Sequence, residues 1–202
     1  MDRPTPSLAD EPPIPERKLH RKRVSLAKRA EANHSGAGWT VYQLWREMNE
    51  ELFGRQMDHC KIQFGTVPES RFGLWIREGP RILLSSSLLQ RDGSRWWLHH
   101  RRLGSNFPRD VLLRQMVFQY ISAVRNAEIT DRAITDRAGT PVEPLGENES
   151  WLQEITRLSE EMELDRPTSP EEARWWPYSV RREGYYGQDQ ADSKSNSPLI
   201  RG

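Results

Sequence analysis

Five His and one Cys could ligate a metal in this sequence, and none stands in a recognisable metal-binding motif. His59 and Cys60 are adjacent, and so are His99 and His100. Adjacent residues of a helix or strand point in different directions, whereas a catalytic zinc needs three protein ligands that converge on one point. We therefore expect structural or surface roles for the histidines, and a packing role for Cys60. No cofactor is predicted.

Other motifs of catalysis are also missing from the sequence. Residues 36–38 (GAG) lack the strand–turn–helix setting of a phosphate-binding loop, and no serine stands in a nucleophile elbow. The single Cys60 excludes a disulfide framework and a four-cysteine zinc ribbon within this sequence, and it fits a reducing, intracellular compartment (cytoplasm, nucleus or nucleoid). No apolar run is long enough for a membrane span, and residues 1–18 have no apolar stretch of the kind found in a secretory signal.

Basic residues gather in two segments, although the net charge of the 202 residues is only +1. One is the run 17–29. The other is the span 71–114, where every basic residue is Arg and where Trp96 and Trp97 are interleaved. Arg pairs bidentately with phosphate, and aromatic rings stack on bases, so this pattern is typical of nucleic-acid binding. The predicted nucleic-acid-binding residues are Arg17, Lys18, Arg21, Lys22, Arg23, Arg91, Arg95, Arg101 and Arg102.

Each basic segment also has an alternative interpretation without a ligand. The run 17–29 would then be a solvated linker. The arginines of the span 71–114 would pair with the protein's own acidic helix in the stretch 143–172, and Trp96 and Trp97 would belong to the core.

The composition, 35% hydrophobic and 29% charged, indicates one domain with tails. Residues 1–38 are expected to form a disordered arm that is first Pro-rich and then basic, with weak helical potential in the basic part. Residues 39–186 would form the domain, including an aromatic C-terminal extension. Residues 187–202 are polar and are expected to be a disordered tail.

Hydrophobic periodicity predicts an α+β order of elements. A first helix is expected from Thr40, with Gln43 completing a capping box, until Gly54 ends it. Strands at 61–64, 72–76 and 81–85 would form a small, mostly antiparallel three-stranded sheet, followed by one helical turn at 87–90. Residues 110–124 are apolar over most of the helix circumference, so this central helix should be buried against both sheet and helix.

The C-terminal part is expected to be helical after a polar loop at 126–146. A helix should open near Asn148, with an apolar face that includes Trp151 and an acidic face that includes Glu154. Ser169 is predicted to cap a further short helix. The aromatic segment 175–178 would fold back over the core or serve as an interface.

Three segments carry a resemblance to a known family. Residues 49–54 (NEELFG) are similar to the Asn-x-x-Leu-Phe-Gly of the first helix of SprT-like zinc metalloproteases. Residues 81–89 (RILLSSSLL) resemble the strand Ile-x-Leu-Ser with its following Leu-Leu. Residues 111–118 (VLLRQMVF) fall where that family has Leu-Leu-His-Glu-x-x-His. The resemblance covers residues 41–164 and implies a zincin-like core whose central helix would carry the metal ligands.

The metal-binding positions of the resembled motif hold other residues. The two His are replaced by Arg114 and Phe118, and the Glu between them by Gln115. The third His, counted from the aromatic Trp151, falls on Glu147. A guanidinium and a phenyl ring cannot bind zinc, and an amide is no general base. The resemblance therefore implies a pseudo-protease without catalytic or metal-binding residues.

The sequence leads to one main hypothesis and two alternatives. The main hypothesis is a non-catalytic SprT-like protein that binds nucleic acid within a larger complex, with protein partners and away from membranes. DNA is the expected form, and the sequence leaves DNA and RNA open. This hypothesis agrees with the association of SprT-like proteases with DNA. One alternative is a protein–protein scaffold that uses the aromatic segment 175–186. The other is a metalloprotease with an unorthodox metal site.

Overall fold

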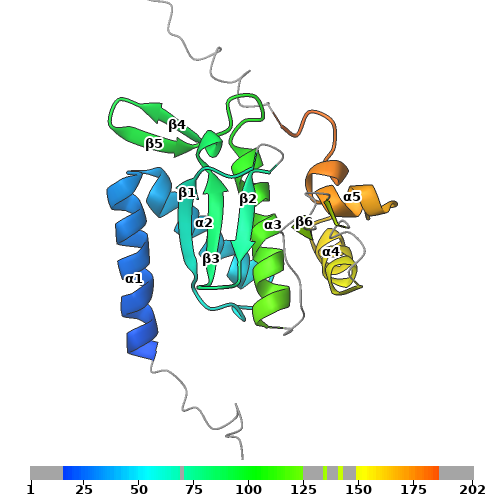
Figure 1. The fold of residues 1–202 in the computed structure, drawn as a ribbon, viewed down its shortest axis with the longest axis horizontal. Helices are drawn as coiled ribbons and strands as arrows, with labels where there is room; N and C mark the ends of the chain where they lie inside the picture. Colours follow the sequence, from blue (N-terminus) through cyan, green and yellow to red (C-terminus); the bar gives the residue numbers. More distant parts are fainter. Residues whose placement is uncertain (1–15, 69–70, 125–133, 136–140, 143–148, 187–202) are drawn as a thin grey trace, which may run out of the picture.

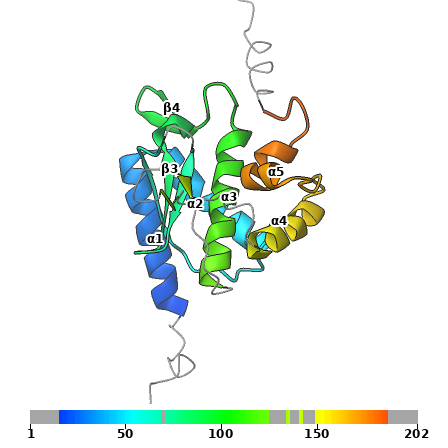
Figure 2. The same cartoon turned by 45° about the vertical axis from the view of Figure 1, so that its right-hand side comes forward.

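The computed structural model describes residues 16–68, 71–124, 134–135, 141–142 and 149–186 of the chain, and it confirms an α+β architecture (Figures 1 and 2). A three-stranded sheet lies beside the central helix, and the remaining helices pack around these two elements. Residues 1–15 of the arm predicted at 1–38, and the tail predicted at 187–202, lie outside the described residues. So does most of the predicted loop 126–146, of which the short strands β6 (Ile134–Thr135) and β7 (Pro141–Val142) are described and pair antiparallel.

Helix α1 (Glu16–Asn33) packs against helix α2 (Ala37–Glu51). The contact is close at Gly38, where an added Cβ would lie 2.2 Å from the backbone carbon and oxygen of Ala30. Ala27 of α1 is buried in the common core. The basic part of the predicted arm is thus a helix that shares the domain core, and the predicted boundary at residue 39 falls after this helix.

Helix α2 begins three residues earlier than predicted, and the predicted capping box is wrong. The N-cap residue is Gly36. The carboxylate of Glu31, at the end of α1, accepts hydrogen bonds from the backbone N–H groups of Gly36 (2.7 Å) and Trp39 (2.8 Å). Thr40 instead donates its hydroxyl proton to the carbonyl of Gly36 (2.8 Å). A carboxylate suits a helix N-terminus because that end has unpaired N–H groups and a positive partial charge.

The three predicted strands are confirmed, but their pairing is mixed. The strands β1 (Lys61–Gly65), β2 (Gly73–Ile76) and β3 (Arg81–Ser85) lie in the order β1-β3-β2. A turn that contains Gly79 (φ +70°) joins β2 to β3 as an antiparallel pair. β3 then lies between β2 and β1 and is parallel to β1, which corrects the expected mostly antiparallel sheet.

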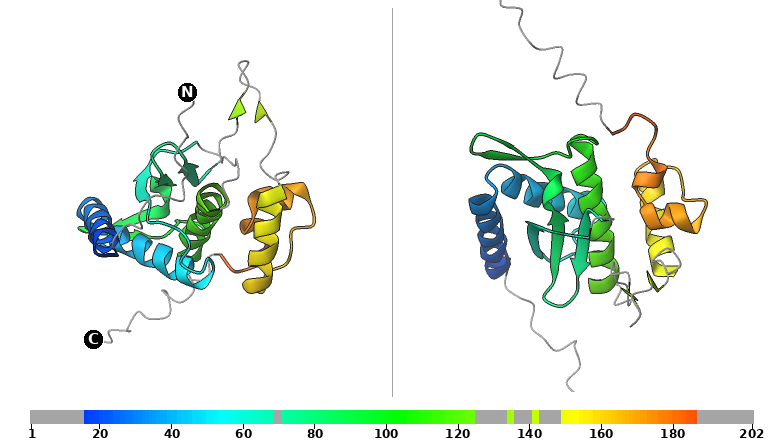
Figure 3. Two further views of the ribbon diagram at one scale, coloured as in Figure 1. Left: turned by 90° about the horizontal axis from the view of Figure 1, so that it is seen from below. Right: turned by 45° about the horizontal axis from the view of Figure 1, so that its top comes forward.

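Helix α3 (Asn106–Ala123) confirms the predicted buried central helix. It packs on β2 and β3 on one side and on α2 and α4 on others, so both sheet and helices cover it (Figure 3). β2 approaches α3 closely at Gly73, where an added Cβ would lie 3.0 Å from Cγ of Gln115.

The C-terminal helices α4 (Glu149–Glu161) and α5 (Pro170–Trp175) are also as predicted, with Ser169 as the cap of α5. Trp176 is fully buried and confirms the fold-back over the core, whereas Trp175 is only partly buried. Glu154 corrects the predicted acidic face, because it is buried and its Oε1 accepts hydrogen bonds from Arg157 on the same helix.

The buried tryptophans tie these elements together through their indole N–H groups. Trp45 donates to Gln119 (3.0 Å), and Trp75 donates to Ser122 (2.8 Å), so α2 and β2 are both bonded to α3. Two further bonds connect α4 with α5 and the residue after it. Trp151 of α4 donates to the carbonyl of Ala173, and Trp176 donates to the hydroxyl of Ser159. A buried indole gains stability from its large apolar area only if its N–H finds an acceptor. Among the described residues, no helix is long and apolar enough to cross a membrane.

Candidate functional site

The positions that resemble a zinc motif are filled with packed side chains. Arg114 and Phe118 lie one turn apart on α3 and face the first turn of α4. The ring of Phe118 stacks on Trp151, with centroids 4.4 Å apart and 15° between the planes. The guanidinium carbon of Arg114 lies 5.1 Å from the Phe118 centroid and 4.9 Å from the Trp151 centroid. Arg114 also donates to the carbonyl of Trp176 (3.3 Å).

This arrangement supports packing rather than metal chemistry. The guanidinium is a permanent cation held against two rings by cation–π attraction, and it neither binds a metal nor accepts a proton. Gln115 contacts Gly73 of β2 instead, and Glu147 lies outside the described residues. In the part of the chain that is described, no three His, Cys, Asp or Glu residues are grouped closely enough to hold a metal ion.

Cys60 lies in the core, whereas His59 is partly buried between the core and a surface cavity. The His59 ring is stacked on Tyr42 and packed against Trp45, at centroid distances of 6.4 and 4.2 Å. Cys60 is buried, and this burial raises its pKa to about 12. A thiol with such a pKa stays protonated at neutral pH, so Cys60 is a poor nucleophile, as expected from the sequence.

The Arg-rich span contains a β-hairpin that the sequence analysis did not predict. Strands β4 (Leu89–Asp92) and β5 (Arg95–Leu98) pair antiparallel, with Arg91 opposite Trp96. The Gly93-Ser94 dipeptide between two strand-forming runs is the signal that would have identified it. The hairpin is attached to the α1–α2 connection, because the backbone N–H of Trp96 donates to the carbonyl of Ser35 (2.8 Å).

The two tryptophans of the hairpin have opposite environments. Trp96 faces the domain and contacts His34 edge to face at 5.7 Å. Trp97 points to the other face of the hairpin and is 48% exposed. The guanidinium of Arg95 lies over the Trp97 ring at 5.8 Å. The interpretation of these tryptophans as core therefore fails for Trp97, and Trp96 is partly buried without belonging to the core.

The turn that follows β5 presents further cationic groups. Arg101 and Arg102 are exposed and line an open hollow together with Phe72 and His100. Burial lowers the pKa of His100, and the neighbouring Arg102 and His99 lower it further. His100 is therefore mainly neutral at pH 7, and the positive charge of this hollow comes from the two arginines.

The predicted binding residues 17–23 and the hairpin β4–β5 lie near opposite ends of α1 (Figure 1). Residues 17–23 occupy the first half of this 18-residue helix; their side chains are outside the description. The hairpin adjoins the connection that follows the other end. Because a helix rises 1.5 Å per residue, the ends of α1 are about 27 Å apart. Arg91 and Arg95 thus lie on opposite faces of the hairpin, beside Trp96 and Trp97, and Arg101 and Arg102 lie on the turn that follows it. Residues 17–23 are near the other end of α1.

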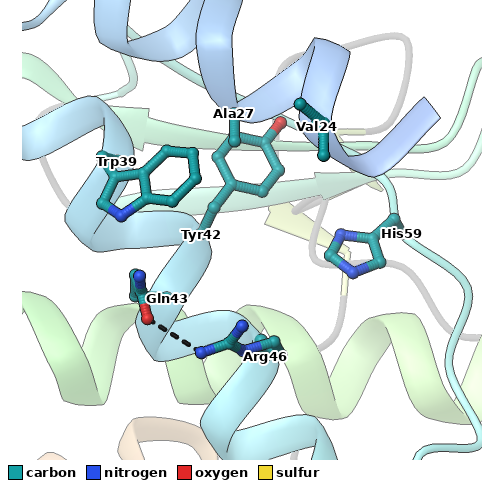
Figure 4. A pocket seen from close by; sticks show the side chains of 7 residues that line it. All are labelled: Val24, Ala27, Trp39, Tyr42, Gln43, Arg46 and His59. Atoms are coloured by element: carbon teal, nitrogen blue, oxygen red, sulfur yellow. Dashed lines mark hydrogen bonds between the residues drawn. The ribbon is translucent and has the colours of Figure 1, made fainter. Parts of the chain in front are cut away.

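A second surface feature, a cavity beside Trp39, was not predicted from the sequence. A cavity of about 290 Å³, called the Trp39 groove below, lies between α1 and α2 (Figure 4). It is lined by Val24, Ala27, Trp39, Tyr42, Gln43, Arg46 and His59. Trp39, Gln43 and Arg46 recur at helical spacing on one side of α2, and this stripe was a signal in the sequence.

Comparisons of the chain with models of protein families, with curated proteins and with solved structures found no match. The SprT-like resemblance therefore stays a prediction that rests on the three sequence segments.

Proposed function

We propose that this chain is a non-catalytic protein of SprT-like type that binds nucleic acid, with DNA as the expected form, as a subunit of a larger nucleoprotein complex. The observation that carries the proposal is the Arg95–Trp97 pair, which is exposed on the outer face of a hairpin with Arg91, Arg101 and Arg102 close by in the chain.

The chemistry of this surface suits a nucleic acid. An exposed indole offers a flat apolar face on which a base stacks, and stacking of this kind is worth about 1–3 kcal/mol per base. The arginines of the hairpin and the following turn supply bidentate donors for phosphate oxygens. Asp92 is the acidic residue of the hairpin, so the local balance of charge is positive.

The absence of catalysis is part of the proposal and is supported by the central helix. The space that two metal-binding His would need on α3 is occupied by the stack of Arg114, Phe118 and Trp151. The alternative of a scaffold built on the aromatic C-terminal segment has less support, because Trp176 is buried against α4.

The test is fluorescence anisotropy with labelled single-stranded and duplex DNA at about 50 and 200 mM salt. We expect salt-sensitive binding by the parent protein. Trp97→Ala should weaken it by about tenfold or more through lost stacking. The triple variant Arg95→Gln, Arg101→Gln, Arg102→Gln should lower the slope of log K against log salt by about 3. Arg55→Gln, an exposed change beside the acidic Glu50, is the control and should bind like the parent.

Two results would overturn the proposal. Binding that is undetectable at the lower salt concentration would remove the nucleic acid as a ligand. Binding that is the same for Trp97→Ala, the triple variant and the parent would remove the hairpin as the site. Metal content is measured on the same preparation, and stoichiometric zinc would favour the metalloenzyme alternative instead.

A further inference from the structure

The Trp39 groove has an apolar floor that the described part of the chain leaves uncovered. Val24 and Ala27 of α1 form one wall, and Trp39 and Tyr42 of α2 form the other (Figure 4). Trp39 is 44% exposed, although an indole buried on folding would contribute a large apolar area to stability. An aromatic side chain held at the mouth of an apolar cavity is typical of an anchor point for a partner.

The polar groups of the groove are few. The hydroxyl of Tyr42 is occupied within the core: it accepts from the backbone N–H of Ile62 (2.8 Å) and donates to the carbonyl of Cys60 (3.4 Å). Gln43 and Arg46 lie at one edge, where Arg46 donates to the Gln43 side-chain oxygen (3.0 Å). A nucleobase inserted into the groove would leave the polar groups of its edge buried without partners, whereas an apolar side chain has none to satisfy. The floor therefore favours an aliphatic or aromatic residue of a peptide.

The charge around the groove selects the kind of peptide. Among the described side chains of α1, residues 24–33 hold two cations and one acid. The acid, Glu31, is occupied with the backbone N–H groups at the start of α2. Helix α2 carries one Arg and three Glu, of which Glu50 pairs with Arg55. Lys28 follows Val24 by one turn and is exposed, and the exposed Arg46 stands at the other wall. A segment that enters between these cations gains favourable electrostatic energy if it is acidic.

We propose that the Trp39 groove binds an acidic segment of a partner protein, which inserts one bulky apolar residue beside Trp39 and directs its carboxylates to Arg46 and Lys28. The groove shares no lining residue with the hairpin β4–β5, and the inference does not depend on the proposed nucleic-acid function.

The test uses the full chain and a random peptide library of about 16 residues, a length that spans a helix-sized groove. Peptides that bind the parent protein are selected after peptides that bind Trp39→Ala have been removed. The best peptide is then synthesised with a fluorescent label, and its affinity for each variant is measured by anisotropy. Circular dichroism and thermal unfolding establish that each variant is folded.

We expect the selected peptides to be acidic with a conserved aromatic or large aliphatic residue. Trp39→Ala should weaken binding at least about tenfold, as truncation of an anchor residue does. Arg46→Glu should weaken it further at low salt. The matched control is Trp97→Ala, since this tryptophan is similarly exposed but lies on the hairpin. Its affinity for the peptide should equal that of the parent.

Three outcomes would overturn the inference. The first is that no peptide is enriched on the parent protein relative to Trp39→Ala. The second is that the enriched peptides are basic or neutral. The third is a loss of DNA affinity in Trp39→Ala equal to that in Trp97→Ala, which would make the groove part of a nucleic-acid surface. Failure of the proposed function has a different signature, because DNA binding would be missing while the peptide still bound.

Discussion

At the scale of single residues, Asp110 determines where the C-terminal segment is held. Its carboxylate is buried in the first turns of α3 and accepts two hydrogen bonds from Arg181, from Nε (2.9 Å) and Nη2 (2.6 Å). The hydroxyl of Tyr186 donates to the same carboxylate (2.7 Å). Burial, and then the charge of Asp110, raise the pKa of Tyr186, so this hydroxyl remains a donor. Residues 181–186 are therefore part of the domain.

Asp110→Asn should destabilise the protein by about 3 kcal/mol, because removal of one partner leaves the Arg181 cation buried without its counter-charge. Urea unfolding followed by tryptophan fluorescence measures this change. The control is Asp92→Asn on the exposed hairpin, which should change stability by less than about 0.5 kcal/mol. The double variant with Arg181→Met should recover part of the loss. Equal stability of Asp110→Asn and the parent would contradict the assignment.

At the scale of elements, local sequence patterns predicted which segments are helices and strands, but they predicted poorly how these elements contact one another. The apolar spacing of α3 and α4 and the cap Ser169 were visible in the sequence, because each depends on residues within a turn or two. The start of α2 was missed because its N–H groups bind Glu31, up to eight residues away. The parallel pairing of β1 with β3 was missed because it depends on the path of the whole chain.

The candidate site shows the same limit. The sequence identified the arginines and tryptophans of the hairpin by type. It left open whether Trp97 was core or surface, since this depends on which hairpin face meets the α1–α2 connection. The Trp39 groove requires α1 to pack on α2, and residues 1–38 were predicted as an arm. The exposure of Trp97 and the existence of the Trp39 groove therefore both depend on tertiary packing rather than on local propensity.

His34 couples the hairpin to the helices and should make the stability of the domain depend on pH. Its ring contacts Phe64 and Trp96 at 5.2 and 5.7 Å, and burial lowers its pKa below the ordinary 6.5. As the pH falls through 6.5, the unfolded chain binds a proton at this residue before the folded protein does. The contribution of His34 to stability is therefore fully present above pH 6.5, and it is lost as the pH falls from 6.5 towards the lower pKa that His34 has in the folded protein.

We expect the free energy of unfolding to fall between pH 7.5 and 5.5, and to fall less in His34→Gln than in the parent. Urea unfolding at each pH gives both slopes. His100 has a lowered pKa as well, so His100→Gln should also reduce the slope, and the double variant should reduce it most. Parallel pH profiles for His34→Gln and the parent would show that His34 does not contribute.

At the scale of the whole molecule, the first half of α1 and the hairpin β4–β5 are two basic regions near opposite ends of that helix (Figure 1). Val24 and Ala27 of α1 also line the Trp39 groove. If both basic regions contact one nucleic acid, it must extend over the length of α1, about 27 Å. Duplex DNA rises about 3.4 Å per base pair, so the distance corresponds to about 8 base pairs. A ligand of this length would bring phosphates to both regions, and a shorter one would reach only one.

Salt dependence measured with duplexes of about 6 and about 16 base pairs tests this arrangement. For the parent protein, the slope of log K against log salt should be steeper with the longer duplex, because more phosphates are neutralised at once. Replacement of Arg17, Arg21 and Lys22 by Gln should lower the slope for the longer duplex to that of the shorter one. Replacement of Arg95, Arg101 and Arg102 should do the same, since either change leaves a single contact region. Equal slopes for the two lengths in the parent would mean that the basic regions never bind the same duplex, and the first half of α1 would then be free to steer an acidic partner into the Trp39 groove.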